Sequence, residues 1–401
     1  MTAADPRRGV VVMPGDGIGK IVVPEAVRVL DAAGFEAAYV RAEIGWDCWT
    51  RDGVALPQRT IDLLGEHRLG LMGAITSKSP AAAEPALPAA QRGRGLKYQS
   101  PILALRQHFG LDVCMRPCRS FPGNPANFVR RGNCGSIEEP ALDIVVFRQN
   151  TEGLYAGVEW TDPPAEVRRA LAIHPRFAPF TAVAGPDLAI TVRIITRAAC
   201  ERILDAAFRY AASRGIDNVT LAEKPNVLRE TSGLFEEAAR QTARSWPQVR
   251  LSVVNIDALL MDLARRPEGH GVIVASNLFG DIVSDAVAGL TGGPGFSSSA
   301  NLGAEVAIFE PTHGSAPAHA AFETPIANPI AAILAGALLA EHAGAPEVAA
   351  RIRTAISEVV AAGRTRTYDM LRLRAGAGVL AEGATGTRAM TDAIIAKLPP
   401  R

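Results

Sequence analysis

Short apolar runs alternate with longer segments of helical period along most of this chain, and no other feature limits its fold as strongly. The apolar run at residues 9–13 ends at a Pro-Gly pair, and the next segment, 18–33, keeps its apolar side chains on one stripe. Parallel strands need crossover connections of a dozen or more residues, which helices of this length provide. The pattern therefore predicts an α/β fold with a largely parallel sheet.

The remaining expected elements continue this alternation. Further strands are expected at residues 35–41, 68–72, 111–116, 143–148, 219–222, 249–255, 272–275 and 306–310. Further helices are expected at residues 193–214, 228–245, 258–265, 279–290, 329–341 and 346–361. Two stretches lack a clear period, so residues 78–95 are expected to form a loop and residues 160–186 an insertion outside the core layers.

Length and composition narrow the class of protein. A chain of 401 residues exceeds what one core usually serves, so two domains, or one domain with a second built into it, are expected. The net charge of +1 argues against a binder of nucleic acid or of a membrane surface, which needs a basic excess. No signal or membrane segment is visible, and five thinly spread cysteines imply no disulfide framework, so a cytoplasmic location is expected.

A glycine-rich sequence at residues 15–20 follows the first expected strand, which is where Rossmann proteins bind a dinucleotide. It reads G-D-G-I-G-K and does not match G-x-G-x-x-G. A looser match at residues 376–381 lies too near the C-terminus to complete a βαβ unit, and the chain has no Walker A sequence. Any nicotinamide nucleotide would therefore bind without the usual Rossmann loop.

Two aspartates, Asp281 and Asp285, lie four residues apart on an expected helix and hence on one face of it. This helix follows a buried strand, where ligand sites of α/β sheets are found. Adjacent carboxylates repel each other, so a cation between them is a natural explanation, and oxygen ligands favour Mg²⁺ or Mn²⁺. Asp257 lies at another junction of strand and helix and could supply a third carboxylate. Solvated acids and a plain helix N-cap are the alternative interpretations.

A basic group accompanies these acids. Arg106, Arg116 and Arg148 lie at or near the ends of expected elements, and guanidinium groups bind carboxylates through two hydrogen bonds. Three of them beside a divalent cation would suit a small polycarboxylic acid, although each alone also fits an ordinary surface arginine.

A lysine and a tyrosine are candidates for proton transfer. Lys224 ends a buried strand, and the following proline restricts its backbone to extended conformations. A lysine near a metal and arginines loses its proton more readily, as a general base requires. Tyr155 lies in the sequence that follows Arg148; a half-buried tyrosine and a surface lysine are the alternatives. The Gly/Ser-rich turn at residues 310–317 could cradle phosphate with its backbone N–H groups.

Together these segments resemble the metal-dependent β-decarboxylating dehydrogenases, the isocitrate, isopropylmalate and homoisocitrate dehydrogenase family. The matching segments follow one another nearly from end to end, at residues 14–19, 105–106, 116–117, 147–160, 224–226, 257, 277–285, 310–317 and 328–329. The resemblance implies an isopropylmalate dehydrogenase-like fold and a homodimer. A large nucleotide-binding domain would comprise residues 1–111 plus 292–401. A small dimerisation and metal domain would comprise residues 112–152 plus 193–291, with a clasp-like segment at 153–192.

The resemblance also implies an active site shared across the dimer, with Lys224 and Asp257 contributed by the other subunit. The implied metal ligands are Asp257, Asp281 and Asp285, and the implied substrate-binding residues are Ser100, Ile102, Arg106, Arg116 and Arg148. Lys224 would assist loss of the 2-hydroxyl proton of a 3-substituted malate while hydride passes to the nicotinamide. The metal would polarise the new 2-oxo group as CO₂ leaves, and Tyr155 would take part in protonating C3.

The nucleotide site implied by the resemblance favours NADP over NAD. Its residues would be Ile75, Thr76, His313, Gly314, Ser315, Ala316, His319, Asn328, Tyr368 and Arg372. NAD enzymes of the family typically carry an aspartate where Ala318 stands. Tyr368 and Arg372 match the pair that grips the 2′-phosphate in NADP enzymes.

Departures from the family pattern bear on the substrate. Gln149 replaces the usual glutamate and Pro225 the usual glycine, both beside catalytic positions. Ser100 matches the serine of isocitrate enzymes, whereas Ile102 replaces their asparagine. The expected reaction is conversion of isocitrate to 2-oxoglutarate. The alternatives are isopropylmalate, homoisocitrate, a tartrate-like or a phosphonate-bearing substrate, and, in other classes, a non-catalytic regulatory subunit or a binding protein for a citrate-like acid.

Overall fold

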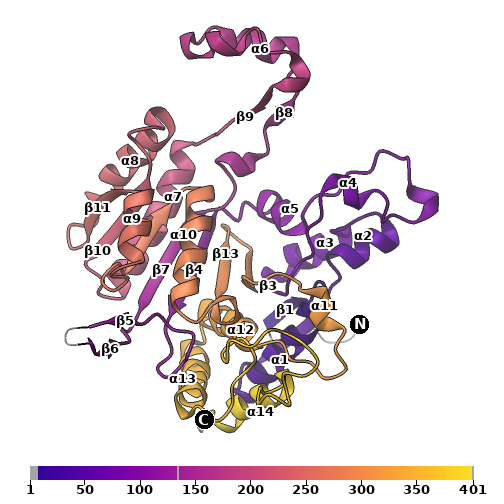
Figure 1. The fold of residues 1–401 in the computed structure, drawn as a ribbon, viewed down its shortest axis with the longest axis vertical. Coiled ribbons are helices and arrows are strands. Elements are labelled where there is room, and N and C mark those ends of the chain that lie inside the picture. The colour runs from indigo at the N-terminus through magenta and orange to yellow at the C-terminus, as the bar shows by residue number, and fades with distance from the viewer. Residues whose placement is uncertain (1–7, 133–134, 400–401) are drawn as a thin grey trace.

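A ten-stranded sheet runs through the molecule in this computed structural model, which describes residues 8–132 and 135–399 (Figure 1). In spatial order the strands are β11 (Arg250–Asn255), β10 (Asn218–Glu223), β12 (Val272–Ala275), β7 (Asp143–Gln149), β4 (Val113–Arg119), β13 (Ser298–Leu302), β14 (Ala307–Pro311), β3 (Leu69–Met72), β1 (Arg8–Met13) and β2 (Ala37–Arg41). Most neighbours are parallel, and the antiparallel pairs are β4 with β7 and β13 with both β4 and β14. The prediction of an α/β fold with a largely parallel sheet is confirmed.

The central strand β13 was not expected from the sequence. It reads S-S-A-N-L, a run of small and polar residues that lacks an apolar signature. Ser298, Ser299, Ala300 and Asn301 are nevertheless at most 3% exposed, because β4 and β14 flank the strand. Tertiary pairing overrides weak local propensity here.

The helices that flank the sheet group by chain segment. Helices from the two ends of the chain share one apolar cluster with β1 and β14; they are α1 (Gly19–Ala32), α12 (Ile330–His342), α13 (Pro346–Ala362) and α14 (Thr387–Ala396). Helices from the middle of the chain cover β7, β10 and β12 on both faces; they are α7 (Arg197–Ser213), α8 (Arg229–Ala243), α9 (Ile256–Leu263) and α10 (Asn277–Leu290). The expected boundaries of two domains remain a prediction, since one sheet joins both groups.

Side chains of β7 show how the middle helices are distributed. Val145 and Phe147 pack in the cluster of α7 and α8, whereas Ile144 and Val146 pack in the cluster of α9 and α10. Successive strand residues point to opposite faces, so these two helix pairs lie on opposite sides of the sheet.

Several expectations are corrected in detail. Residues 78–95 are not wholly irregular, since they contain α4 (Pro80–Ala83) and η1 (Ala89–Gln91). The helix expected from residue 193 begins at Arg197, because Thr196 caps it by accepting a hydrogen bond from the Ala199 N–H. Helices that the sequence did not predict include α2 (Trp46–Asp52), α3 (Gln58–His67), α5 (Pro101–His108) and α14, besides the short α4, α6 (Ala165–Ala172) and α11 (Pro317–Ala320).

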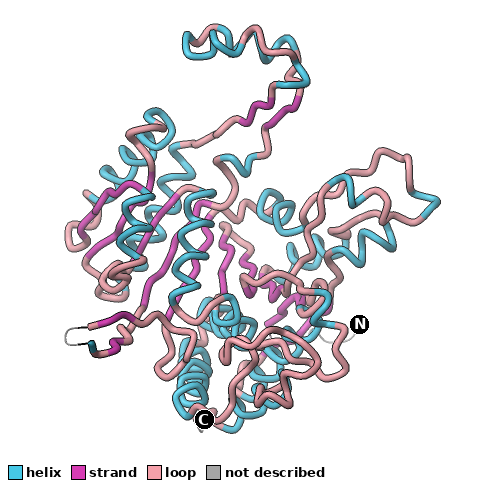
Figure 2. Tube along the Cα trace, viewed as in Figure 1, coloured by secondary structure: helices cyan, strands magenta, loops and turns pink. Residues whose placement is uncertain are grey.

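The insertion at residues 160–186 lies outside the core, as expected. Its base is an antiparallel ribbon of β8 (Glu159–Thr161) and β9 (Ala189–Thr191), and its tip contains α6 (Ala165–Ala172), which has no buried residue. Figures 1 and 2 show this arm projecting from the rest of the molecule.

Two chemical features of the described chain bear on its environment. Cys48, Cys114, Cys118 and Cys200 are buried and free. No helix within residues 8–132 and 135–399 is long and apolar enough to cross a membrane.

Candidate active site

Two of the predicted arginines and both predicted aspartates of α10 meet beside β4 and β7. Arg148, 2% exposed near the end of β7, forms an ion pair with Asp281. Arg116 of β4 lies 3.4 Å from the Asp281 carboxylate and 3.1 Å from that of Asp285. α10 approaches this closely because Gly280 has no side chain: a Cβ there would lie 2.7 Å from Arg148 Cβ.

Tyr155 joins the same cluster from η3 (Leu154–Ala156). Its hydroxyl donates to Asp281 Oδ2 at 2.7 Å, and the Arg148 guanidinium carbon lies 5.0 Å from the centre of its ring. Burial raises the pKa of Tyr155, and the hydrogen bond to Asp281 adds to the increase. The phenol therefore remains a proton donor at neutral pH.

The electrostatics of the cluster favour an anionic ligand. Burial lowers the pKa of Arg148, and the positive charges of Arg116 and Arg106 lower it further. Arg116 Nε is buried and has no hydrogen-bond partner in the part of the chain that the structure describes. Buried donors normally have a partner, so a carboxylate placed here would both satisfy this N–H and reduce the repulsion among the arginines.

Arg106 extends the cluster through buried polar residues. From α5, its Nε donates to Asn301 Oδ1 at 3.1 Å, and its guanidinium lies 3.5 Å from Glu310. Asn301 in turn donates to Glu310 Oε1 at 2.8 Å and accepts from Asn150 at 2.8 Å. Asn301 escaped sequence reasoning because the strand that carries it, β13, was not expected.

The two residues expected to select the substrate lie at the start of α5. Ser100 precedes the helix, and Ile102 is partly buried against a neighbouring apolar cluster. Arg106 lies near the other end of the same helix, so α5 connects these positions to the arginine cluster by a rigid element.

Asp281 and Asp285 are two carboxylates that one chain can offer as ligands to a hard divalent cation. Burial raises the pKa of Asp285, and the negative charge of Asp281 contributes to the increase, so a cation between them would relieve an existing repulsion. Among residues 8–132 and 135–399, no three His, Cys, Asp or Glu side chains of one chain form a group that could hold a metal. One chain thus brings two of the three predicted ligands together.

The third predicted ligand pairs elsewhere, with the predicted base. Asp257 in the first turn of α9 forms an ion pair with Lys224, which follows β10. The hydrogen bond from Lys224 lowers the pKa of Asp257. The Asp257 side chain is 66% exposed, so it is available to a group outside its own chain.

A buried carboxylate that sequence reasoning missed supports this end of β10. Glu223 is 0% exposed, accepts from Arg193 at 2.9 Å and accepts from the backbone N–H of Ser276 at 2.9 Å, just before α10. It thereby ties the strand that precedes Lys224 to the helix that carries Asp281. An acid at the end of a strand whose other residues are uncharged is the sequence signal for this role.

Two predicted nucleotide-binding segments, at Thr76 and at Ser315, meet at the start of α1. Asp16, 2% exposed, accepts from the Thr76 N–H at 2.8 Å, and the Thr76 and Ser315 hydroxyls lie 2.6 Å apart. The Ile18 N–H donates to the Ser315 carbonyl at 2.8 Å. Gly17 has φ +51°, and a Cβ there would lie 2.0 Å from that carbonyl, so only glycine permits this approach. Sequence reasoning did not single out Asp16.

His313 presents an unsatisfied polar atom next to this turn. Its Nδ1 lies 3.0 Å from the Gly314 carbonyl, whereas its buried Nε2 has no partner among the residues described. Burial lowers the pKa of His313, so the ring is neutral at pH 7. A polar atom of a bound nucleotide would suit this position.

Several residues expected around the ribose form hydrogen bonds within the chain. Asn328 donates to Asp369 at 2.9 Å, and the Tyr368 hydroxyl lies 3.4 Å from His319 Nδ1. Arg372 is exposed and donates to the Pro125 carbonyl at 3.0 Å. A role for Arg372 in binding a 2′-phosphate therefore requires its side chain to leave that carbonyl.

Comparisons with known proteins agree with this geometry. Residues 9–394 match the model of the family described as isocitrate/isopropylmalate dehydrogenase. The chain is 36% identical over 354 residues to 3-isopropylmalate dehydrogenase of Methanothermobacter thermautotrophicus, covering 88% of this chain and 91% of that one. It is 35% identical over 370 residues to Protein DlpA of Legionella pneumophila, covering 92% of this chain but only 57% of the length of that relative.

A solved structure agrees as well. The crystal structure of isocitrate dehydrogenase from Methylococcus capsulatus superimposes with a TM-score of 0.79 at 34% identity, covering 98% of this chain and 99% of that one. The match to the family model spans nearly all of the sequence, and the fold agrees with it. The chain therefore belongs to the isocitrate/isopropylmalate dehydrogenase family, whose members are β-decarboxylating dehydrogenases.

Proposed function

We propose that this protein catalyses the NAD(P)- and metal-dependent oxidative decarboxylation of a 3-substituted malate, with isocitrate as the first candidate substrate. The observation that carries the proposal is the cluster of Arg116, Arg148, Tyr155 and Asp281. It joins an unsatisfied buried guanidinium N–H, a neutral phenol and a carboxylate in one place. A substrate with several carboxylates and a carbon to be protonated would use all three groups.

Some residues of the chain bind the substrate, and others transfer protons. Arg116 and Arg148 hold the substrate carboxylates, and Arg106 lies behind them on α5. Tyr155 keeps its proton because its pKa is raised, so it can deliver that proton to C3. Lys224, contributed by a second subunit, accepts the proton of the 2-hydroxyl. When bound, the nucleotide would accept hydride, and a divalent cation would supply Lewis acidity at the 2-oxygen.

Asp281 and Asp285 of one subunit and Asp257 of the other are proposed to hold Mg²⁺ or Mn²⁺. The pairing of Asp257 with Lys224 at an exposed position supports this arrangement, because both groups would enter the partner's site together. The protein would then be a homodimer with two shared active sites. The free buried cysteines are compatible with a reducing, cytoplasmic location.

The sharing of sites has a direct test. Lys224→Ala and Tyr155→Phe are each expected to be inactive as homodimers. If the site is shared, a mixed dimer carries both lesions in one site and an intact second site, so mixing the refolded variants restores up to about half of the activity per active dimer. Absence of any recovery in dimers shown to be mixed would contradict the sharing.

NADP is the proposed nucleotide. Ala318 puts no carboxylate near the ribose, so nothing at this position repels a 2′-phosphate, and Tyr368 and His319 offer polar groups there. Comparing kcat/KM for NADP⁺ and NAD⁺ tests this choice, and a strong preference for NAD⁺ would refute it.

Isopropylmalate is the second candidate substrate. Partly buried Ile102, where isocitrate enzymes carry asparagine, favours a less polar tail. Homoisocitrate, tartrate-like and phosphonate-bearing acids complete the set to be screened.

The experiment is a screen of these acids with NADP⁺ or NAD⁺ and Mg²⁺ or Mn²⁺, following absorbance of the reduced nicotinamide and release of CO₂. Turnover that requires the metal and yields CO₂ is expected with at least one acid. Binding of an acid without turnover would instead support a binding protein or a regulatory subunit, and would refute the proposal.

A further inference from the structure

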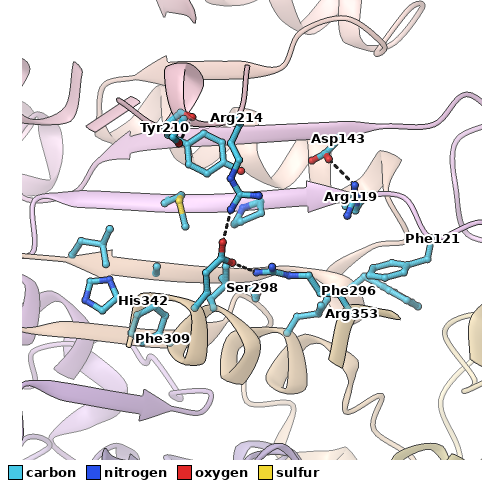
Figure 3. Close-up of a pocket in the computed structure, with 18 residues that line it drawn as sticks. Arg119, Phe121, Asp143, Tyr210, Arg214, Phe296, Ser298, Phe309, His342 and Arg353 are labelled. Atoms are coloured by element: carbon cyan, nitrogen blue, oxygen red, sulfur yellow. Dashed lines mark hydrogen bonds and ion pairs between the residues drawn. The ribbon is translucent and has the colours of Figure 1, made fainter. Parts of the chain in front are cut away.

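A cavity of about 330 Å³ lies on the face of the sheet opposite to the candidate active site (Figure 3). Met115 and Pro117 of β4 line it, whereas Arg116 between them points to the active-site face. Residues of β13 also alternate between the two faces of the sheet: Ala300 lines the cavity, and Asn301 contacts Arg106 on the other side. Alternation along these two strands separates the cavity from the active site by the thickness of the sheet.

The cavity is apolar at its base and bounded by both groups of helices. Met115, Leu302 and Phe309 contribute apolar surface from the sheet, Phe121 from the loop after β4 and Phe296 from η6 (Pro294–Phe296). One wall contains Tyr210 of α7, a helix from the middle of the chain. The opposite wall comes from α12 and α13, which lie in the C-terminal part of the chain. A volume above 300 Å³ with a mainly apolar lining is typical of a small-molecule site.

The rim carries more positive than negative charge. Glu341 of α12 bridges two arginines, pairing through one oxygen with Arg214, which directly follows α7, and through the other with Arg353 of α13. Arg119 and Asp143, 3.1 Å apart, balance each other. Burial lowers the pKa of neighbouring His342, so its ring adds no charge at pH 7. One positive charge is therefore left over at the mouth of an apolar cavity.

The two bridged arginines retain donors for a second anion. A guanidinium group carries five N–H bonds, and Glu341 engages the Nη2 atom of each arginine. The remaining donors can bind another carboxylate through charge-assisted hydrogen bonds. The single excess positive charge would leave the further carboxylates of a polycarboxylate unpaired. A neutral molecule would not compensate this charge.

We propose that this cavity is a second binding site, for a small amphipathic monocarboxylate. Its carboxylate binds Arg214 and Arg353 beside Glu341, and its hydrocarbon part packs against Met115, Leu302 and Phe309. The site is separate from the arginines of the active site and does not depend on the proposed reaction.

Calorimetric titration of the full-length protein with octanoate tests this proposal, with octanol as the neutral probe of similar shape. Octanoate is expected to bind saturably, and Arg353→Gln to weaken its binding at least about tenfold, because a charge-assisted hydrogen bond is lost. The matched control is Arg240→Gln, because Arg240 forms its ion pair on exposed α8, remote from the cavity. Ala300→Leu, which fills the cavity but retains the charges, covers the case in which Arg353→Gln does not fold.

Each other outcome overturns the proposal. Absence of saturable octanoate binding would do so, as would equal affinity of octanol. Unchanged affinity in Ala300→Leu would place the probe elsewhere. Displacement of octanoate by excess isocitrate and Mg²⁺ would assign it to the active-site arginines. All readouts are binding measurements, so failure of the catalytic proposal leaves this test intact.

Discussion

Asp281 is the residue on which most contacts of the candidate site converge. Its carboxylate accepts from Tyr155, pairs with buried Arg148 and lies within 3.4 Å of Arg116. The side chain is nevertheless 30% exposed, so it faces ligand as well as protein. A residue with this position orients the proton donor and the carboxylate-binding groups, and is also available to a cation.

Replacing Asp281 by asparagine is expected to abolish turnover and leave the fold intact. Asparagine keeps the size and one acceptor oxygen but removes the charge that compensates Arg148, so the free energy of unfolding should fall by about 1–3 kcal/mol. Circular dichroism, urea unfolding and the turnover assay measure these effects. Asp205→Asn is the control, because Asp205 pairs with Arg209 on the exposed face of α7. Near wild-type turnover in Asp281→Asn would contradict the role in metal binding.

At the scale of elements, hydrogen-bonded contacts join segments that are distant in sequence, and we call each of these contacts a joint. The start of α1 contacts the turn at Ser315, and both contact Thr76 after β3. The loop before α5 is held by Tyr98, whose hydroxyl donates to the Thr76 carbonyl at 2.7 Å. The rings of Trp46 and Trp49 pack against Tyr98 with centres 5.3 and 5.4 Å away.

Gly17→Ala tests the joint at the start of α1. The new Cβ would collide with the Ser315 carbonyl in a left-handed conformation, so a loss of about 1–3 kcal/mol in unfolding free energy is expected, together with weaker NADP⁺ binding. Gly289→Ala is the matched control. Gly289 is exposed near the end of α10 with no atom within 4 Å of its added Cβ, so a gain of about 0.5–1 kcal/mol is expected there. Equal stabilities of the two variants would contradict the argument.

Tyr98→Phe tests the joint that holds the segment before α5. The ring packing is retained and the hydrogen bond is lost, so local opening should become easier and tryptic cleavage within residues 78–97 about two- to tenfold faster. Exposed Lys78, Arg92, Arg94 and Lys97 are the cleavage sites. Tyr210→Phe on α7 provides the control and should leave this rate unchanged. A rate that is unaltered in Tyr98→Phe would show that the hydrogen bond does not restrain the segment.

At the scale of the whole molecule, folding raises the pKa of all five tyrosines. Burial is the first cause of a raised pKa for Tyr39, Tyr98, Tyr155, Tyr210 and Tyr368, and it raises the pKa of Tyr98 to about 12. In the unfolded chain each phenol has a pKa near about 10. The folded state therefore holds its phenolic protons to higher pH than the unfolded state.

Alkaline stability follows from this difference. Because the unfolded chain loses protons first, the tyrosines stabilise the fold fully below a pH of about 10, and this stabilisation is lost as pH rises through their folded pKa values. Urea unfolding between neutral and alkaline pH is expected to show the decline, and ultraviolet absorbance to show tyrosinate appearing later in native than in urea-unfolded protein. Coincident titration of the native and unfolded protein would contradict the prediction.

Local pattern was sufficient for the fold class and for singling out the acidic, basic, lysine and tyrosine candidates, whereas the substrate-selecting residues and most nucleotide-binding residues came only from the resemblance to a family. The alternation of strand and helix periods is a property of neighbouring residues, and it predicted the parallel strands and the long helices. The α10 aspartates were recognisable because they lie four residues apart on a helix that follows a buried strand, and Arg148 because it lies near the end of an apolar strand. Asn301 and Asp16 were not, because a polar residue in a short or weak segment has no local signature, and Glu223 was not, because one acid at the end of a strand does not reveal its partners.

Only the tertiary structure decided which of these groups meet. The order of strands brings β4 beside β7 and β13, and this places Arg116 with Asp281 on one face and Met115 with the cavity on the other. Within residues 8–132 and 135–399 of one chain, it does not gather Asp257 into one metal-holding group with Asp281 and Asp285, although all three were predicted as ligands of one metal. Hydrophobic period is determined by neighbours a few positions away, whereas contacts between charged groups depend on strand order and packing across hundreds of residues, which no local pattern encodes.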